Sequence, residues 1–152
     1  MGIPITTIGR KLMTEPSVPQ APTAAFIGAS WLALVAGAAT YLIGLFNAEM
    51  ALNEKGYYLT LLMYGLFAAV SLQKSVRDRA ESIPVSGLYF ALCWLSLLLA
   101  LLLLLIGLWN ANLALSEKGF YGMAYLLSLF ASVAVQKNVR DVSLVRQAAL
   151  AK

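Results

Sequence analysis

Four long apolar segments alternate with short polar stretches along this chain. The segments cover roughly Ala24–Phe46, Tyr57–Leu72, Ser86–Trp109 and Phe120–Val135. A helix needs about 20 residues to cross the hydrocarbon core of a bilayer. The first and third segments reach that length alone, and the second and fourth reach it once their polar flanks supply a turn at each end. The pattern therefore predicts an all-α membrane protein with four transmembrane helices.

The composition agrees with this prediction. Of the 152 residues, 61% are hydrophobic and only 12% are charged, whereas about 25% of a soluble domain is charged. The net charge of +4 does not indicate nucleic-acid binding, because the basic residues stand at the ends of the apolar segments. Basic residues in such positions are typical of a membrane protein, in which lysine and arginine flank the transmembrane helices.

Lysine and arginine are distributed unequally between the two sides of the membrane that four spans create. The short turns after the first and third segments hold only Lys55 and Lys118. Nine basic residues occupy the N-terminal tail, the central connection and the C-terminus: Arg10, Lys11, Lys74, Arg77, Arg79, Lys137, Arg140, Arg146 and Lys152. Because basic loops are retained in the cytoplasm, both termini are predicted to be cytoplasmic and the two turns periplasmic.

The two halves of the chain align without a gap at an offset of 63 positions. Trp31 matches Trp94, Gly44 matches Gly107, and about two dozen of roughly 59 compared positions are identical. Self-similarity of this kind indicates an internal duplication. Each copy has two spans, so both copies point the same way across the membrane. We predict two parallel two-helix repeats related by a pseudo-two-fold axis along the membrane normal.

This duplication suggests four regions. The first transmembrane repeat covers residues 24–83 and the second covers residues 84–142. A proline-rich cytoplasmic tail precedes them at residues 1–23, and a cytoplasmic C-terminal tail follows at residues 143–152. Proline disfavours a regular helix, which is why the first region is separated from the helices.

A polar phrase, NEKGYY, opens the second segment and recurs as SEKGFY before the fourth. Asn53 and Ser116 are good N-cap residues, and each precedes a glutamate that favours the positive end of a helix dipole. Upstream, Asn47 and its counterpart are expected to end the preceding helix in a left-handed conformation. The alternative for them is a hydrogen bond between helices.

The same phrase also raises a functional hypothesis. Its polar side chains could form a paired site facing the periplasm, although a duplicated structural turn explains them equally well. The candidate residues of this periplasmic turn are Asn47, Glu54, Lys55, Asn110, Glu117 and Lys118.

A second repeated phrase, QKSVRD and QKNVRD, ends the even-numbered segments. Its lysines and aspartates stand four residues apart, a spacing that allows weak ion pairs on a helix. Lysine and arginine there can extend to the headgroups and anchor the helix, and a docking surface for a cytoplasmic partner is the alternative. The candidate residues of these helix ends are Gln73, Lys74, Arg77, Asp78, Gln136, Lys137, Arg140 and Asp141.

Small residues form a candidate helix-packing stripe on the first segment. Ala25, Ala29, Ala33 and Gly37 follow one another at intervals of four, a spacing that allows close helix contact in lipid. The first helix is therefore expected to be more buried than the third, and the stripe favours a homo-oligomer. The equivalent positions of the third segment are Leu88, Leu92, Ser96 and Ala100.

These repeated phrases give the chain a family resemblance. With "N-A-x-x-A-L-x-E-K-G-[YF]-Y" and "Q-K-x-V-R-D" each present twice, the chain resembles the YiaA/YiaB inner-membrane proteins of bacteria. That family is built from a two-helix domain, and the likeness covers about Ala24 to Asp141. The resemblance implies a location in the bacterial inner membrane, and it implies no activity, cofactor or binding residue.

Candidate chemistry is sparse. Histidine is absent, and Cys93 is the only cysteine, without a basic neighbour to form a thiolate. The sequence therefore predicts no enzyme, no catalytic or metal-binding residue and no cofactor. It favours a scaffold or accessory protein that binds other membrane proteins. The alternative is a small channel or transporter, although the first and third segments lack the charged residue that ion-coupled carriers use.

Overall fold

The computed structural model describes residues 21–150, which form four helices. They are α1 (Ala24–Asn47), α2 (Leu52–Ala80), α3 (Gly87–Asn110) and α4 (Leu115–Leu150). All four are long and apolar enough to cross a membrane, and no strand occurs among the described residues. The predicted all-α, four-helix class is therefore confirmed. Residues 1–20 of the predicted tail lie outside the described part.

The two odd-numbered helices begin in the same way. The Thr23 hydroxyl accepts a hydrogen bond from the Phe26 N–H at 3.3 Å, and the Ser86 hydroxyl accepts one from the Tyr89 N–H at 3.2 Å. Each hydroxyl satisfies a backbone donor that the first turn of a helix leaves free. The cap residues are 63 positions apart, so the duplication reproduces the start of the helix as well as its apolar face.

The two even-numbered helices extend well beyond their apolar segments. Polar turns at both ends lengthen α2, and α4 continues without a break to Leu150. The region from residue 143 onward, predicted as a tail, is therefore helical as far as the structure describes it. Leucine, alanine and valine without an interior proline explain this continuity, since each adds to the helix at little cost.

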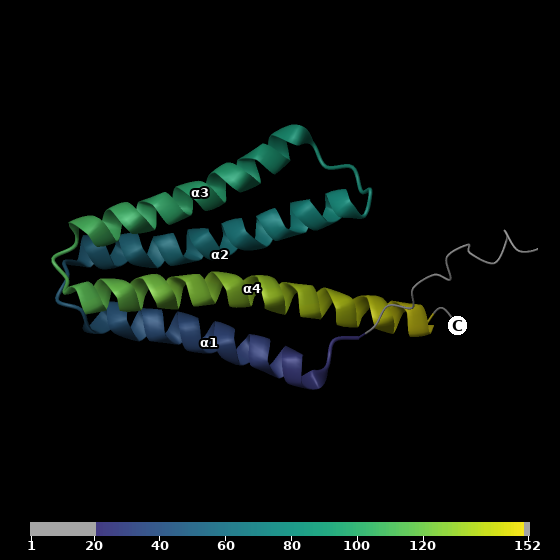
Figure 1. Ribbon diagram of the computed structural model, residues 1–152, viewed down its shortest axis with the longest axis horizontal. Coiled ribbons are helices and arrows are strands. Elements are labelled where there is room, and N and C mark those ends of the chain that lie inside the picture. The colour runs from purple at the N-terminus through teal and green to yellow at the C-terminus, as the bar shows by residue number, and fades with distance from the viewer. Residues whose placement is uncertain (1–20, 151–152) are drawn as a thin grey trace, which may run out of the picture.

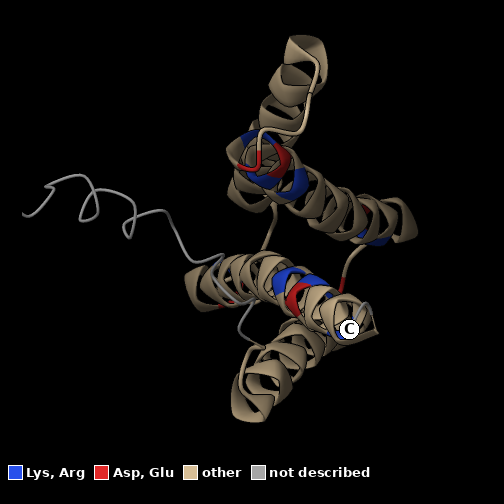
Figure 2. Ribbon diagram, turned by 90° about the vertical axis from the view of Figure 1, so that its right-hand side faces the viewer, with Lys and Arg blue, Asp and Glu red and all other residues tan. Residues whose placement is uncertain are grey.

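The helices lie in a row in the order α3, α2, α4, α1 (Figure 1). The most extensive contacts join α1 to α4 and α2 to α3, and α2 and α4 meet in the middle. The end-on view separates the same two pairs (Figure 2). Each outer helix therefore packs mainly on the inner helix of the other repeat, and hardly on the helix that follows it in sequence.

The core lies in the half of the molecule nearest the two hairpin turns. Tyrosine rings contact one another there: Tyr41 packs edge-on against Tyr121 with ring centroids 5.6 Å apart, and it also contacts Tyr125 at 6.0 Å. The buried apolar cluster around these rings comprises Tyr41, Leu45, Tyr58, Leu61, Leu62, Ala69, Leu104, Leu108, Tyr121, Ala124, Tyr125 and Leu129.

The outer helices α1 and α3 bury equivalent positions. Each has four buried residues, and the two sets are 63 positions apart throughout. The expectation that α1 is more buried than α3 is therefore wrong, because the same face of each outer helix meets an inner helix. The buried residues are Ser30, Gly37, Tyr41 and Leu45 in α1, and Cys93, Ala100, Leu104 and Leu108 in α3.

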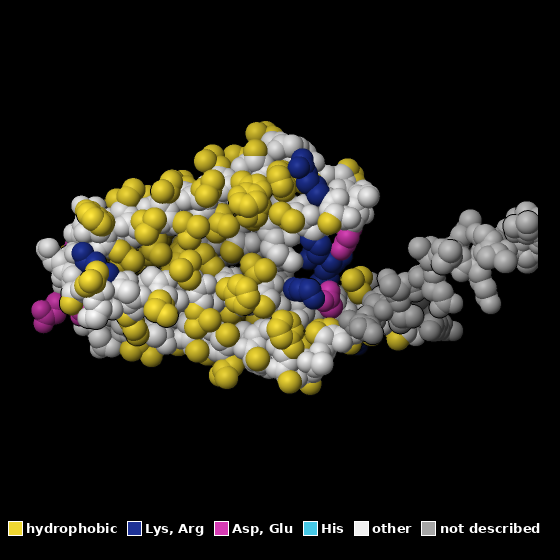
Figure 3. Space-filling model, in the orientation of Figure 1, with side chains coloured by type: hydrophobic (Ala, Val, Ile, Leu, Met, Phe, Trp, Pro, Cys, Tyr) yellow, Lys and Arg dark blue, Asp and Glu magenta, His cyan; other side chains and the backbone are white. Residues whose placement is uncertain are grey.

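Charged side chains gather near the two ends of the molecule (Figure 3). The face shown there is covered with hydrophobic side chains between those ends, as expected for a protein that spans a bilayer. We call the end formed by residues 48–51 and 111–114 the turn end. The opposite end, which carries Lys74, Arg77, Lys137 and Arg140, is called the basic end.

Candidate functional site: two matched clefts at the turn end

The lysine of the repeated phrase caps the helix that precedes it. Lys55 Nζ donates a hydrogen bond to the main-chain oxygen of Phe46 at 2.9 Å, and Lys118 Nζ donates one to that of Trp109 at 3.2 Å. Carbonyls in the last turn of a helix have no partner within the helix, and a cation there also favours the negative end of the dipole. Both lysines therefore have a structural role at the turn end.

The glutamate of the phrase caps the helix that follows. Glu54 Oε2 accepts a hydrogen bond from the Ala51 N–H at 2.9 Å, and Glu117 Oε2 accepts one from the Ala114 N–H at 2.8 Å. Each glutamate is the third residue of its helix, and its partner is the residue that directly precedes the helix. This hydrogen bond is one half of a capping box.

The predicted N-caps, Asn53 and Ser116, are wrong by two positions. Both lie inside the first helical turn, because α2 begins at Leu52 and α4 at Leu115. The signal for the correct helix starts was the capping glutamate. Glu54 and Glu117 stand three residues after Ala51 and Ala114, which are the residues that precede the helices.

The asparagines that end the odd-numbered helices bond to their own helix. Asn47 Nδ2 donates to the Ile43 carbonyl and Asn110 Nδ2 donates to the Ile106 carbonyl, both at 2.8 Å. Among the described non-glycine residues only Ser82 has a positive φ. Neither the left-handed ending nor the bond between helices is found. Each asparagine donates to a carbonyl one turn earlier in its own helix, and its side-chain oxygen remains as an acceptor.

A cleft of about 390 Å³ opens between the start of α2 and the end of α3. Glu54, Tyr57 and Tyr58 line it from α2, where a spacing of three and four residues places them on one helix face. Gly107 and Asn110 line it from the last turn of α3. The remaining lining residues are Glu49, Met50, Asn53, Ala111, Asn112 and Leu113.

A second cleft of about 380 Å³ repeats this arrangement between α4 and α1. Glu117, Phe120 and Tyr121 line it from α4, and Gly44 and Asn47 line it from α1. Each of these residues is 63 positions from its counterpart in the first cleft. Two similar polar clefts therefore stand at the turn end, each lined by both repeats.

The glycine of each cleft allows the helices to approach closely. A methyl group added at Gly107 would lie 2.8 Å from Tyr57 Cε1 and 3.2 Å from Tyr58 Oη. At Gly44 it would lie 2.8 Å from Phe120 Cε1. These separations are shorter than van der Waals contact, so only glycine fits without a shift of the aromatic rings.

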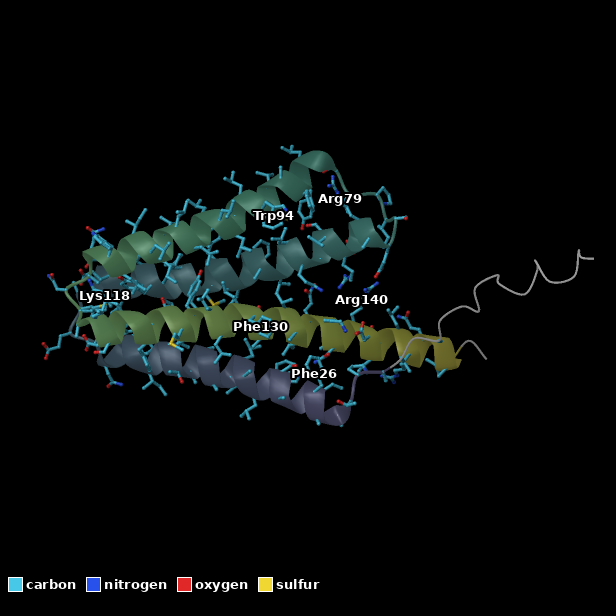
Figure 4. The ribbon with its side chains drawn as sticks, in the orientation of Figure 1. Phe26, Arg79, Trp94, Lys118, Phe130 and Arg140 are labelled. Carbon is cyan, nitrogen blue, oxygen red and sulfur yellow. The ribbon has the colours of Figure 1, made fainter. Side chains whose placement is uncertain are left out.

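The structure thus divides the six polar residues of the predicted periplasmic turn. Glu54 shares one cleft with Asn110, and Glu117 shares the other with Asn47. The lysines line neither cleft, because they reach the carbonyls of the preceding helices; Figure 4 labels Lys118 at this end of the molecule. Sequence reasoning missed the tyrosines and glycines of the clefts, although their 63-residue recurrence was visible.

At the basic end, the repeated phrase forms ion pairs within each helix. Lys74 Nζ and Lys137 Nζ each lie 2.7 Å from the aspartate four residues later. Arg140 of α4 forms an ion pair with Glu81, which directly follows α2, and so links the two inner helices (Figure 4). Arg79 lies 3.9 Å above the Phe90 ring of α3, a cation–π contact.

Polar side chains of the predicted helix ends also enter the packed interior. Asn138 is 1% exposed, and its Nδ2 donates to the Ser30 hydroxyl of α1 at 3.0 Å. Asp78 is also buried, between Lys74 and Arg77 on its own helix. The amide oxygens of Gln73 and Gln136 are buried without a hydrogen bond among the described residues.

The candidate packing stripe of α1 is only partly covered. Gly37 is buried against Ser128 of α4, and Ala33 is half-buried. Ala25 and Ala29 are exposed. The line along which α1 packs on α4 instead follows its four buried residues, which begin at Ser30.

Comparison with known proteins places these features in a family. The model of the yiaA/B two helix domain matches the chain twice, at residues 26–78 and 89–141. The inner membrane protein YiaA of Escherichia coli is 58% identical over 120 residues, which are 79% of this chain and 83% of YiaA. The inner membrane protein YiaB of the same organism is 34% identical over 100 residues, 65% of this chain and 84% of YiaB.

A shorter match adds a single-copy relative. The uncharacterized membrane protein YubF of Bacillus subtilis is 40% identical over 60 residues, which are 39% of this chain and 69% of YubF. The remaining third of YubF is too short for a second domain of the length matched here. No solved structure matches the chain.

Four apolar helices, two domain matches and relatives named as membrane proteins define the class: a multi-pass membrane protein built from tandem two-helix domains. The chain belongs to the YiaA/YiaB family of inner membrane proteins.

Proposed function

We propose that this chain is a non-catalytic component of the inner membrane that acts by binding other membrane proteins, including a second copy of itself. The observation that carries the proposal is a set of exposed small residues on one face of α1, on both sides of the exposed Leu32. Ala25, Gly28, Ala29 and Ala36 are all exposed, and a methyl group added at Gly28 would meet no atom within 4 Å.

Small residues on a lipid-facing helix favour close contact with another helix, because lipid chains offer no comparable packing against a flat backbone. The equivalent positions of α3 are bulkier, with Leu88, Leu92 and Leu99 exposed. The difference between two otherwise equivalent outer helices therefore supports α1 as the surface for a partner helix. In a homodimer with two-fold symmetry, the same face would be used twice.

The proposed orientation places both termini in the cytoplasm and the turn end in the periplasm. The nine-to-two division of lysine and arginine supports it. A pseudo-two-fold axis between α2 and α4 is part of the same proposal, supported by the cleft residues and helix caps that recur 63 positions apart.

Crosslinking in native membranes tests the partner surface. A cysteine placed at Ala29 in a Cys93→Ser background should form adducts with a neighbouring helix, identified by mass spectrometry as a second copy or another membrane protein. The matched control is a cysteine at Leu92, the equivalent position of α3. Equal crosslinking at both positions, or none at Ala29, would reject the proposal. The channel alternative instead predicts solute flux through the purified protein in liposomes.

A further inference from the structure

We propose that the two clefts at the turn end bind ammonium groups, each taking one organic cation such as the headgroup of an ethanolamine lipid or a free alkylammonium ion. The proposal assigns a ligand class to a site that the scaffold role does not need. It rests on four features that both clefts share: a carboxylate without a lining lysine or arginine, an aromatic pair, an unpartnered tyrosine hydroxyl and a set of further oxygen acceptors.

The first feature is the charge of the clefts. Glu54 and Glu117 each use one carboxylate oxygen for the helix cap, which leaves the other oxygen available. No lysine or arginine lines either cleft. The negative end of one helix dipole and the positive end of another meet at each cleft, so the two partial charges offset each other. Lys55 and Lys118 lie beside the clefts but bind the main-chain oxygens of Phe46 and Trp109. The charged groups that line the clefts are therefore carboxylates, which favour a cation.

Aromatic walls are the second feature. The rings of Tyr57 and Tyr58 lie 5.2 Å apart at 82°, and those of Phe120 and Tyr121 lie 5.7 Å apart at 83°. Two rings at nearly a right angle form two walls of a cage, and the face of each ring attracts a cation. An aromatic pair beside a carboxylate suits an organic ammonium group.

The third feature is a tyrosine hydroxyl that lines each cleft without a hydrogen bond. Tyr58 is 5% exposed and Tyr121 is 4% exposed, yet neither hydroxyl has a hydrogen bond to any described residue. Tyr41, Tyr57 and Tyr125 by contrast donate theirs to main-chain carbonyls. Neither phenol oxygen is among the fully buried polar atoms of the described residues, so each is open to its cleft and can accept a hydrogen bond from an ammonium N–H.

The fourth feature is a set of acceptors matched to such donors. Asn110 and Asn47 donate their amide nitrogens to their own helices, so their side-chain oxygens are free to accept. Each cleft thus offers a carboxylate, an amide oxygen and a phenol oxygen to an ammonium ion. Clefts of about 390 and 380 Å³ fall within the usual size range of ligand sites. Each cleft is therefore large enough to hold one headgroup ammonium ion.

A metal ion is a poorer fit to the same residues. No group of three or more histidine, cysteine, aspartate or glutamate side chains converges anywhere in the described part of the chain. Calcium and magnesium prefer several oxygen ligands, with carboxylates prominent among them, whereas these clefts combine one or two carboxylates with aromatic carbon.

The experiment measures binding of tetramethylammonium and ethanolammonium to the full-length protein in phosphatidylglycerol nanodiscs, by saturation-transfer NMR. We expect saturable binding of ethanolammonium. In the Glu54→Gln/Glu117→Gln variant it should weaken at least about tenfold, since a charge-assisted contact is lost. Glutamine still accepts the cap hydrogen bond, so the variant keeps its helix starts. Asp141→Asn, which removes one charge at the basic end, should bind like the parent.

A second variant keeps the test independent of the caps. Tyr58→Phe/Tyr121→Phe removes only the two hydroxyls and should weaken ethanolammonium binding severalfold, while tetramethylammonium, which has no N–H, should bind unchanged. Loss of ethanolammonium binding when phosphatidylethanolamine replaces the disc lipid would identify the headgroup as the ligand. Persistence would identify a free cation. Absence of saturable binding, or equal binding by the glutamine variant and the parent, would overturn the proposal.

Discussion

The Tyr125 hydroxyl of α4 donates a hydrogen bond to the main-chain oxygen of Leu61 in α2, at 3.2 Å. Its ring lies directly against Gly65, one helical turn further along α2. Tyr125 is completely buried, so this contact stands at the centre of the row of helices. It joins the two repeats, and it has no counterpart in the first repeat, because the residue equivalent to Tyr125 there is Leu62.

This contact predicts that Gly65→Ala destabilises the protein. The added methyl group would overlap the Tyr125 hydroxyl, and forcing an extra carbon into a packed interior costs about 1–3 kcal/mol. We expect a lower midpoint of thermal unfolding in detergent. Gly56→Ala is the control on the same helix, because nothing lies within 4 Å of its added methyl group. Adding Tyr125→Leu should restore part of the loss, and an unchanged midpoint for Gly65→Ala would contradict the packing described.

A second prediction concerns the lysine caps. Lys55→Met and Lys118→Met should each loosen the end of the preceding helix, because the carbonyl of Phe46 or Trp109 loses its donor. A cation at such a position contributes about 0.3–1 kcal/mol. Hydrogen exchange should accelerate at the last turns of α1 and α3. Lys137→Met is the control, because Lys137 pairs with Asp141 of its own helix, and it should leave both turns protected. Identical exchange rates in all three variants would show that the lysines do not cap these helices.

Division of the chain should reveal that neither repeat is stable alone. If residues 1–82 and 83–152 are expressed together, α1 can pair with α4 and α2 with α3, the most extensive contacts of the fold. We expect the two pieces to accumulate and purify together. Each piece expressed by itself should be degraded or should self-associate. A stable monomer of either piece, measured by mass in mild detergent, would show that contacts within a repeat suffice.

The orientation can be measured with single cysteines in a Cys93→Ser background. Cysteines at Asn53 or Ser116 should react with a membrane-impermeant maleimide added to intact spheroplasts, since these exposed residues belong to the turn end. A cysteine at Arg146 should react only after the membrane is opened. This pattern follows from retention of basic segments in the cytoplasm. Labelling of Arg146→Cys alone in intact spheroplasts would reverse the proposed topology.

Local signals in the sequence were sufficient for the helices themselves. Apolar length gave four spans, and α1 and α3 differ from the predicted segments by only one residue at their ends. The duplication likewise indicated that caps and clefts would occur twice. The starts of α2 and α4 were misplaced because asparagine and serine looked like caps, while the capping glutamates stood at the third helical position.

The pairing of the helices could not be predicted in the same way. A repeat shows which positions are equivalent, but it does not show whether a helix packs within its own copy or on the other one. Ser30 illustrates the difficulty, since its partner Asn138 is 108 positions away. In the other copy these positions hold Cys93 and Ser75, so this hydrogen bond has no repeated signature. The hydrogen bonds of Tyr41 and Tyr125 likewise occur once only, because the equivalent residues, Leu104 and Leu62, have no hydroxyl.

The pairing of α1 with α4 has a consequence for biosynthesis. A chain is synthesised from its N-terminus, so the first helix enters the bilayer before any residue of its main partner exists. During that interval the α1 face with Gly37, Tyr41 and Leu45 has only lipid or the insertion machinery to contact. The hairpin of α2 and α3 can assemble earlier, and docking of the last helix on the first completes the molecule. A ribosome that stalls before Leu115 therefore leaves a nascent chain whose first helix is unpaired and open to quality-control proteases.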